Sequence, residues 1–185
     1  MNQPLLIVVT GRPGSGKTTL AHKLAQEIRC PCLCRDEFKE GLVNTAGSDH
    51  AALGKGANLE VYETFFQAIE LLLRRGITLV AEAAFQHKLW APKLEPLQVL
   101  CRLRMVVCTL DPQMGRARFV ERGLADPHRQ RFHGDRAVQA AREGVALPVG
   151  EYEPPHLPAP TLTVDTTDGY RPDLAGIVAF VAGDH

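Results

Sequence analysis

One short segment near the start of the chain combines residue types and spacings that can bind polyphosphate. Residues 11–18 read Gly-Arg-Pro-Gly-Ser-Gly-Lys-Thr and fit the pattern G-x-x-x-x-G-K-[ST]. In such a loop the main-chain N–H groups point at phosphate oxygens, the lysine reaches the β- and γ-phosphates, and the last hydroxyl is a ligand for Mg²⁺. We therefore expect a nucleoside triphosphate site with these binding residues: Gly11, Arg12, Pro13, Gly14, Ser15, Gly16, Lys17, Thr18 and Thr19.

Two other interpretations of this segment are weaker. A glycine-rich turn with a solvated lysine would need neither the strand before the segment nor the helix after it, and the sequence predicts both. A dinucleotide-binding loop would read G-x-G-x-x-G and would have an acidic residue at the end of the second strand, where Asp36 does lie. The Gly16-Lys17-Thr18 tripeptide favours the triphosphate loop, with Lys17 as a catalytic cation and Thr18 as the Mg²⁺ ligand.

The elements around the loop should bring acidic residues to it. The apolar run at residues 5–10 predicts a buried parallel strand before the loop, and the apolar spacing over residues 17–28 predicts a helix after it. A second strand at 32–35 ends on Asp36 and Glu37, where a short helix begins, and a third strand at 77–81 ends on Glu82. Because ligands gather at the carboxyl ends of parallel strands, these acids should lie beside the loop.

The rest of the chain continues the same alternation. We expect helices at residues 59–75, 90–100, 112–122, 135–143 and 172–181, strands at 102–110 and 161–165, and irregular chain at 45–56, 123–134 and 144–160. This order predicts an α/β fold in three layers, α/β/α, around a mostly parallel five-stranded sheet. At 185 residues, the chain 1–185 should form a single domain.

The composition narrows the class of function. The chain is 45% hydrophobic and 23% charged, and its formal net charge is +0. Without an overall positive field, a long nucleic acid is not the expected partner. The apolar run at residues 4–10 is too short to span a bilayer and has no basic region before it, so we expect a cytoplasmic protein without a membrane partner.

Cysteines and histidines give no clear metal signature in the sequence. The five cysteines are an odd number, which favours reduced thiols over a disulfide scaffold. Cys30, Cys32 and Cys34 lack the paired C-x-x-C spacing of zinc sites and have no histidine at a matching interval, so we interpret them as small apolar strand residues. His128 and His133 have a spacing that could hold a metal, and we interpret them as exposed loop side chains.

Four segments together resemble the small P-loop kinases: residues 11–19, Arg35-Asp36, residues 80–82, and the arginine-bearing stretch 116–131. This group includes polynucleotide 5′-hydroxyl kinases, chloramphenicol phosphotransferase and zeta-type toxins. The likeness spans nearly the whole chain, and only the phosphate loop is specific by itself. It implies a P-loop NTPase fold with a helical, arginine-bearing lid at about 112–134, and it implies ATP and Mg²⁺ as cofactors, with GTP not excluded.

The resemblance also implies roles for two carboxylates. Asp36 matches the residue that accepts the proton of the attacking hydroxyl; a helix-capping Asp36 and a base at Glu37 stay open as alternatives. Glu82 matches an acid that orients either a Mg²⁺-bound water or the acceptor, although P-loop enzymes more often have Asp as the metal-binding acid. An ordinary polar residue at the end of a strand is the alternative for Glu82.

Lid arginines in this family close on the transferring phosphate, because a planar guanidinium can bridge phosphate oxygens. Solvated surface arginines are the alternative. The matching catalytic candidates are Arg118, Arg122 and Arg129. The family likeness further implies that residues 166–168 receive the adenine base through backbone contacts.

The acceptor side is less well defined. Arg35, Lys39 and Glu82 lie where an acceptor would approach, and the absence of a basic stripe interleaved with aromatic residues disfavours a nucleic-acid groove. We interpret Phe85 and Trp90 as packing residues. The expected activity is transfer of the γ-phosphoryl group of ATP to a hydroxyl of a small molecule. The alternatives are a nucleotide-dependent switch or partner-binding NTPase, and a polynucleotide 5′-hydroxyl kinase.

Overall fold

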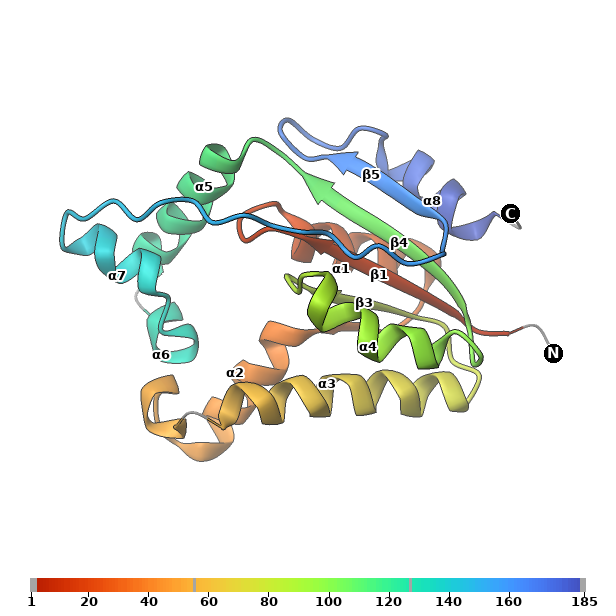
Figure 1. Cartoon of the computed structure of the whole chain (residues 1–185), viewed down its shortest axis with the longest axis horizontal. Coiled ribbons are helices and arrows are strands. Elements are labelled where there is room, and N and C mark those ends of the chain that lie inside the picture. The colour runs from red at the N-terminus through yellow and green to blue at the C-terminus, as the bar shows by residue number, and fades with distance from the viewer. Residues whose placement is uncertain (1–2, 55, 127, 184–185) are drawn as a thin grey trace.

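A single parallel sheet organises the protein. The computed structural model describes residues 3–54, 56–126 and 128–183. Five strands, in the order β2-β3-β1-β4-β5, pair in parallel throughout, which confirms the predicted sheet (Figure 1). Their bounds are β1 Leu5–Gly11, β2 Cys32–Cys34, β3 Leu79–Ala83, β4 Arg102–Thr109 and β5 Thr161–Asp165.

Helices cover both faces of this sheet, so the three-layer α/β/α architecture is confirmed. Their bounds are α1 Lys17–Ile28, α2 Arg35–Ala46, α3 Ala57–Arg74, α4 His87–Leu97, α5 Pro112–Ala125, α6 Arg129–His133, α7 Arg136–Arg142 and α8 Leu174–Ala182, with a 3₁₀ turn η1 at His50–Leu53. One apolar core lies between the sheet and α3 and α4, and the second lies between the sheet and α1 and α8. No helix in the described ranges combines the length and the apolarity needed to cross a bilayer.

The central strand explains why the chain folds around this register. All seven residues of β1 are buried, as expected for a strand with neighbours on both sides and helices on both faces. Val9 pairs with Glu82 of β3 on one side and with Val106 of β4 on the other. The loop that follows β1 therefore lies next to the carboxyl ends of both neighbouring strands.

Several boundaries differ from the sequence prediction, and three of the differences lie near the site. Strand β3 runs through Glu82, which lies inside the strand and not after it. Helix α2 begins directly at Arg35 and is 12 residues long, so part of the loop expected at 45–56 is helical. The loop expected at 123–134 contains the end of α5 and all of α6. These segments gain their helical structure from tertiary contacts among α2, α5, α6 and α7, which local polarity does not reveal.

The irregular stretch 144–160 runs back along the sheet to β5, crossing in front of the strands in Figure 1. Tyr152 anchors it: its hydroxyl lies 2.7 Å from Thr10 Oγ1, at the end of β1. Trp90 donates to the same threonine oxygen, at 3.1 Å. Trp90 is fully buried against Phe65, Phe66 and Phe85, so Trp90 and Phe85 are packing residues as predicted.

Candidate functional site

The loop between β1 and α1 has the backbone shape of a phosphate cradle. Gly14 and Gly16 both have positive φ angles, 83° and 75°, which residues other than glycine rarely adopt. A Cβ on Gly14 would lie 2.0 Å from the carbonyl oxygen of Gly115 in α5, so the loop and α5 can approach this closely only with glycine at position 14. The predicted loop residues therefore lie together, against the first turn of α5.

The polar groups of this loop are available to a ligand. Gly16, the residue before α1, has no side chain to cap the first N–H groups of the helix. The hydroxyl of Ser15 is buried and has no hydrogen-bond partner in the described part of the chain. Helix-terminal N–H groups without a side-chain cap, next to a partnerless hydroxyl, fit an anion, as the motif predicts.

Lys17, Thr18 and Glu82 form a compact group below the loop. Lys17 Nζ lies 3.3 Å from Glu82 Oε1, and Thr18 donates to Glu82 Oε2 at 3.1 Å. Glu82 is only 2% exposed and Lys17 only 8%. The structure thus brings together the predicted phosphate-binding lysine, the predicted Mg²⁺ ligand and the predicted acid. A hydroxyl and a carboxylate side by side are suitable oxygen ligands for Mg²⁺, directly or through water.

Asp36 lies in the first turn of α2, next to this group. Its carboxylate contacts Arg35 at 3.2 Å and keeps 47% of its side chain exposed. Partial burial raises the pKa of Asp36, but the positive charges of His133, Lys17 and Arg35 outweigh that effect and hold the pKa below its usual value. No side chain caps α2 at its preceding residue, Cys34, so Asp36 is not an N-cap here. An ionised, accessible carboxylate beside Lys17 can accept a proton.

Helices α5, α6 and α7 gather at one end of the molecule, beyond the carboxyl edge of the sheet (Figure 1). There Arg129 of α6 pairs with Asp135 at 3.4 Å. Partial burial and the charge of Arg129 lower the pKa of Arg122, and the carboxylates of Asp36, Asp135 and Glu82 act against that shift. Arg122 therefore lies within electrostatic reach of Asp36 and Glu82, and Arg129 lies near Arg122.

Lys39 and His133 join α2 to α6. The buried Lys39 ammonium donates to the carbonyl oxygen of His133 at 3.2 Å, and burial, followed by the charge of Arg35, lowers its pKa. His133 is itself buried and lies 2.8 Å from Glu40 Oε1. The interpretation of His133 as an exposed loop histidine is wrong. Its position at the end of a loop-like, polar sequence gave no sign of burial, which comes from the packing of α6 on α2.

Arg118, the third predicted lid arginine, points elsewhere. Its guanidinium donates to the carbonyl oxygens of Thr166 and Thr167, at 3.0 and 2.7 Å. It thus links α5 to the turn after β5, the turn expected to hold a nucleotide base. A direct role of Arg118 at the phosphate stays a prediction, and it would require these two hydrogen bonds to break.

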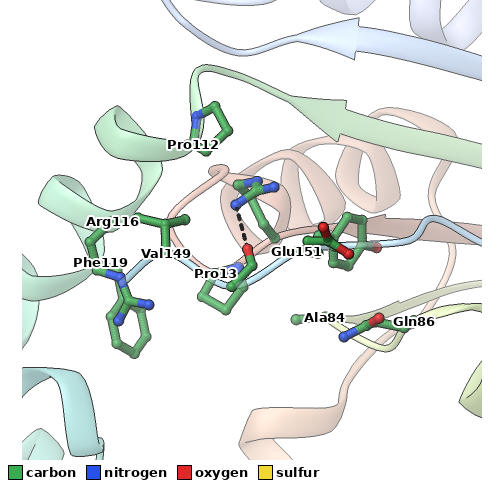
Figure 2. A pocket seen from close by; sticks show the side chains of 11 residues that line it. Pro13, Ala84, Gln86, Pro112, Arg116, Phe119, Val149 and Glu151 are labelled. Atoms are coloured by element: carbon green, nitrogen blue, oxygen red, sulfur yellow. Dashed lines mark hydrogen bonds between the residues drawn. The ribbon is translucent and has the colours of Figure 1, made fainter. Parts of the chain in front are cut away.

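A pocket of about 270 Å³ opens beside the phosphate loop (Figure 2). Arg12 and Pro13 of the loop, Arg116 and Phe119 of α5, and Glu151 of the irregular segment line it together with neighbouring residues. Its walls include none of the groups that would take part in phosphoryl transfer, namely Lys17, Asp36 and Glu82. We assign no acceptor to it.

Comparison with known families agrees with this geometry. A family model described as an AAA domain matches residues 6–148, which include all but the first residue of β1, the phosphate loop, Asp36, Glu82 and all of α5 to α7. The chain belongs to this AAA domain family. This match, together with the solved kinase structures described next, confirms the predicted resemblance to the small P-loop kinases.

Solved structures show how widely this AAA domain fold is used. A candidate kinase from Chloroflexus aurantiacus is 27% identical, with a TM-score of 0.75, and the match covers 98% of this chain and 95% of the other. The APS kinase of Mycobacterium tuberculosis, in complex with AMPPNP and APS, is 17% identical with a TM-score of 0.63, covering 99% and 100%. A sugar kinase from a Janibacter species is 14% identical with a TM-score of 0.60, covering 97% and 94%. The last two likenesses concern the fold.

The sequence did not indicate a role for some residues that the structure places around the site. Asp135 pairs with Arg129, Glu40 with His133, and Tyr152 closes over the end of β1. Glu40 lies one helical turn after Asp36 on α2, a spacing that could have indicated a shared face. Tyr152 lies in proline-rich irregular chain, where no periodicity indicates which side chains turn inward.

Proposed function

We propose that this AAA domain protein is an ATP-dependent phosphotransferase that moves the γ-phosphoryl group to a hydroxyl of a small molecule. The observation that carries the proposal is the arrangement of Lys17, Thr18 and Glu82 under a glycine cradle, with the ionised carboxylate of Asp36 beside them. Phosphoryl transfer needs little beyond such positioning and charge stabilisation. The 27% identical candidate kinase supports the same class of activity.

On the donor side, the loop N–H groups and Lys17 would hold the phosphates, and GTP could occupy the same cradle. Thr18 would hold Mg²⁺, with Glu82 as a ligand directly or through water; bound there, the ion would neutralise charge that develops on the phosphates. Lys17 would exchange part of its interaction with Glu82 for the phosphate oxygens. The buried ion pair therefore keeps the lysine positioned before the nucleotide arrives.

On the acceptor side, Asp36 takes the proton of the acceptor hydroxyl. The acceptor oxygen then forms a bond to the γ-phosphorus while the bond from that phosphorus to the β–γ bridging oxygen breaks, and ADP leaves with the bond electrons. Because the pKa of Asp36 is low, its main contribution is to orient the hydroxyl and to accept the proton late in the reaction. Arg35, on the same helix, would bind polar groups of the acceptor. Lys39 would do so only if its ammonium left the carbonyl oxygen of His133.

We assign the lid to residues 112–134, within a single domain 1–185. Arg122 would contact the transferring phosphate, since it lies within electrostatic reach of Asp36 and Glu82. Arg129 would contact it as well, since it lies near Arg122. Arg118 would hold the turn at residues 166–168 that receives the base. Because ATP is the phosphoryl donor, we place the reaction in the cytoplasm.

The test is a screen with γ-labelled ATP, in which hydroxyl-bearing metabolites and 5′-hydroxyl oligonucleotides are offered separately. We expect label on a small acceptor, with Asp36→Asn lowering the transfer rate by about 10²–10⁴-fold and leaving ATP affinity within about twofold. Label released only as inorganic phosphate, with stimulation by a protein partner, would support a switch instead. If Glu37→Gln, and not Asp36→Asn, removed transfer, the assignment of the base would be wrong.

A further inference from the structure

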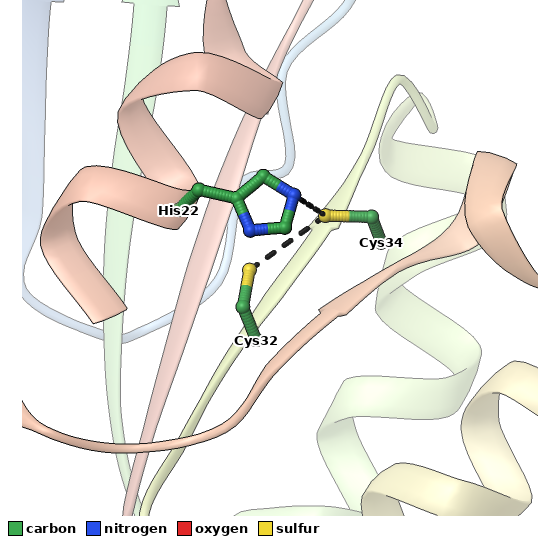
Figure 3. A group of neighbouring side chains, drawn as sticks. All are labelled: His22, Cys32 and Cys34. Carbon is green, nitrogen blue, oxygen red and sulfur yellow. Dashed lines mark hydrogen bonds between the residues drawn. The ribbon is translucent and has the colours of Figure 1, made fainter. Parts of the chain in front are cut away.

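Three side chains outside the phosphate site meet between α1 and β2. His22 extends from α1, one helical turn after Thr18, and Cys32 and Cys34 extend from the same face of β2 (Figure 3). Cys34 Sγ lies 3.6 Å from Cys32 Sγ and 3.5 Å from His22 Nε2, and the three donor atoms all lie within 4.8 Å of one another. The sequence prediction of merely apolar cysteines did not foresee this contact.

Two of these separations, from Cys34 to Cys32 and from Cys34 to His22, match those between the ligands of a tetrahedral zinc ion, and the third pair of donor atoms lies within 4.8 Å. With Zn–S bonds of about 2.3 Å and Zn–N bonds of about 2.0 Å, two sulfur ligands lie about 3.8 Å apart, and a sulfur and a nitrogen about 3.5 Å apart. Hydrogen bonds between thiols and an imidazole hold the three side chains at similar distances in the chain without metal. The donor types do favour one class of ion, because two thiolates and an imidazole select zinc or copper(I) over Mg²⁺.

The surroundings leave a way in for an ion. Glu37 Oε1 lies 2.8 Å from His22 Nε2 but is not among the residues whose donor atoms all lie within 4.8 Å of one another, so a water molecule would take the fourth position. Cys34 is fully buried and held by the sheet, Cys32 is partly buried, and 48% of the His22 side chain is exposed. The ligand set is thus fixed on its sulfur side and open to solvent on its imidazole side, where an ion could enter.

We propose that His22, Cys32 and Cys34 bind one thiophilic metal ion, with zinc as the probe that represents this class. Binding displaces the two thiol protons and the hydrogen bond between Glu37 and His22, and it changes no oxidation state. The ion would tie α1, which carries Lys17 and Thr18, to β2, which leads directly into Asp36. The proposal does not depend on phosphotransferase activity.

The test uses the full-length chain without an affinity tag, reduced by a phosphine and free of nucleotide and Mg²⁺. Titration with Co²⁺ should give a thiolate-to-cobalt charge-transfer band that saturates at one ion per chain, and Zn²⁺ should displace it. Zn²⁺ should also raise the midpoint of thermal unfolding, because it binds the folded chain. His22→Gln, an exposed change that the fold should tolerate, should weaken zinc binding at least about tenfold, as should Cys32→Ser.

Cys30→Ser is the matched control, because Cys30 lies in the same cluster of cysteines but outside the three-residue site. It should keep the cobalt band and the zinc-dependent rise in the unfolding midpoint. The absence of a charge-transfer band in the wild-type chain would overturn the proposal. Equal zinc affinity of the wild-type and His22→Gln chains would overturn it as well, since zinc would then bind through other residues.

Discussion

At the scale of single residues, the site depends on a buried ion pair formed before any nucleotide binds. Lys17 and Glu82 lie 3.3 Å apart with almost no exposure, and Thr18 supplies a further hydrogen bond to the same carboxylate. In such a pair, the attraction between the two charges offsets the hydration that each charge loses on burial. When one charge is removed, the other stays buried with no compensation. The lysine that binds phosphate is therefore also part of the folded structure of the free protein.

Removal of Lys17 should accordingly destabilise the chain even without nucleotide. We expect Lys17→Ala to lower the free energy of unfolding by about 3 kcal/mol, since Glu82 keeps its burial and loses its cation. Lys17→Ala/Glu82→Gln should recover most of this loss, and Gln26→Ala, on the exposed side of the same helix, should change stability by less than about 0.5 kcal/mol. Urea denaturation measures all three, and a Lys17→Ala chain as stable as the wild type would contradict the argument.

Asp36 should contribute to a pH dependence of stability. Its pKa in the folded chain is lower than in the unfolded chain, where it is about 3.9, so its contribution is complete above that value and disappears as the pH falls through the folded pKa. The stability difference between the wild type and Asp36→Asn should be present at about pH 5 and shrink below about pH 4. Urea denaturation across this range measures it; a difference that already shrinks between pH 7 and pH 6 would indicate a raised pKa instead.

At the scale of elements, α5 connects the proposed lid to the rest of the site. Its first half is held by Arg118 on the turn after β5 and by the contact of Gly115 with Gly14 of the phosphate loop. Its second half packs on α7, where Gly123 faces Val138. A movement of α5 would therefore change the base side, the phosphate loop and the arginines together.

Two arginines one turn apart on α5 should have different kinetic effects. Arg118→Ala should raise the KM for ATP several-fold with little change in kcat, because it releases the turn at Thr166 and Thr167. Arg122→Ala should lower kcat by about 10³-fold, the scale for an arginine that neutralises charge in the transition state. Steady-state kinetics with the acceptor found in the screen separates the two, and equal effects on kcat would contradict the assignment.

The packing of α5 on α7 has a simple steric test. A Cβ on Gly123 would lie 2.4 Å from a methyl of Val138, so Gly123→Ala should destabilise the chain by about 1–3 kcal/mol. Gly41→Ala is the matched control, because a Cβ there meets nothing and alanine favours the interior of α2 by up to about 1 kcal/mol. Hydrogen exchange should show faster opening of residues 129–142 in the first variant only. A Gly123→Ala chain as stable as the wild type would contradict the proposed packing of α5 on α7.

At the scale of the whole molecule, the sequence predicted the sheet and the phosphate loop well. The apolar run at residues 5–10 and the helical spacing after Lys17 are patterns among neighbouring residues, so they can be recognised without knowledge of tertiary contacts. Glu82 was predicted to follow the third strand directly, and it lies inside that strand, one residue before its end. The difference arises because composition marks the ends of strands only weakly. The burial of His133 was not predictable, because it results from contact with Glu40 of α2, which is far away in the sequence. The contact of His22 with Cys34 was not predictable either, because it joins two different elements, α1 and β2, through tertiary packing.

The central claim is that the loop at residues 11–18 cradles the triphosphate of a nucleotide. Isothermal titration calorimetry of the folded chain with ATP and Mg²⁺ tests it most directly. We predict binding of one nucleotide per chain that weakens strongly in Lys17→Ala and is retained in Asp36→Asn. Absence of heat with both ATP and GTP, from protein shown to be folded by circular dichroism, would contradict the account.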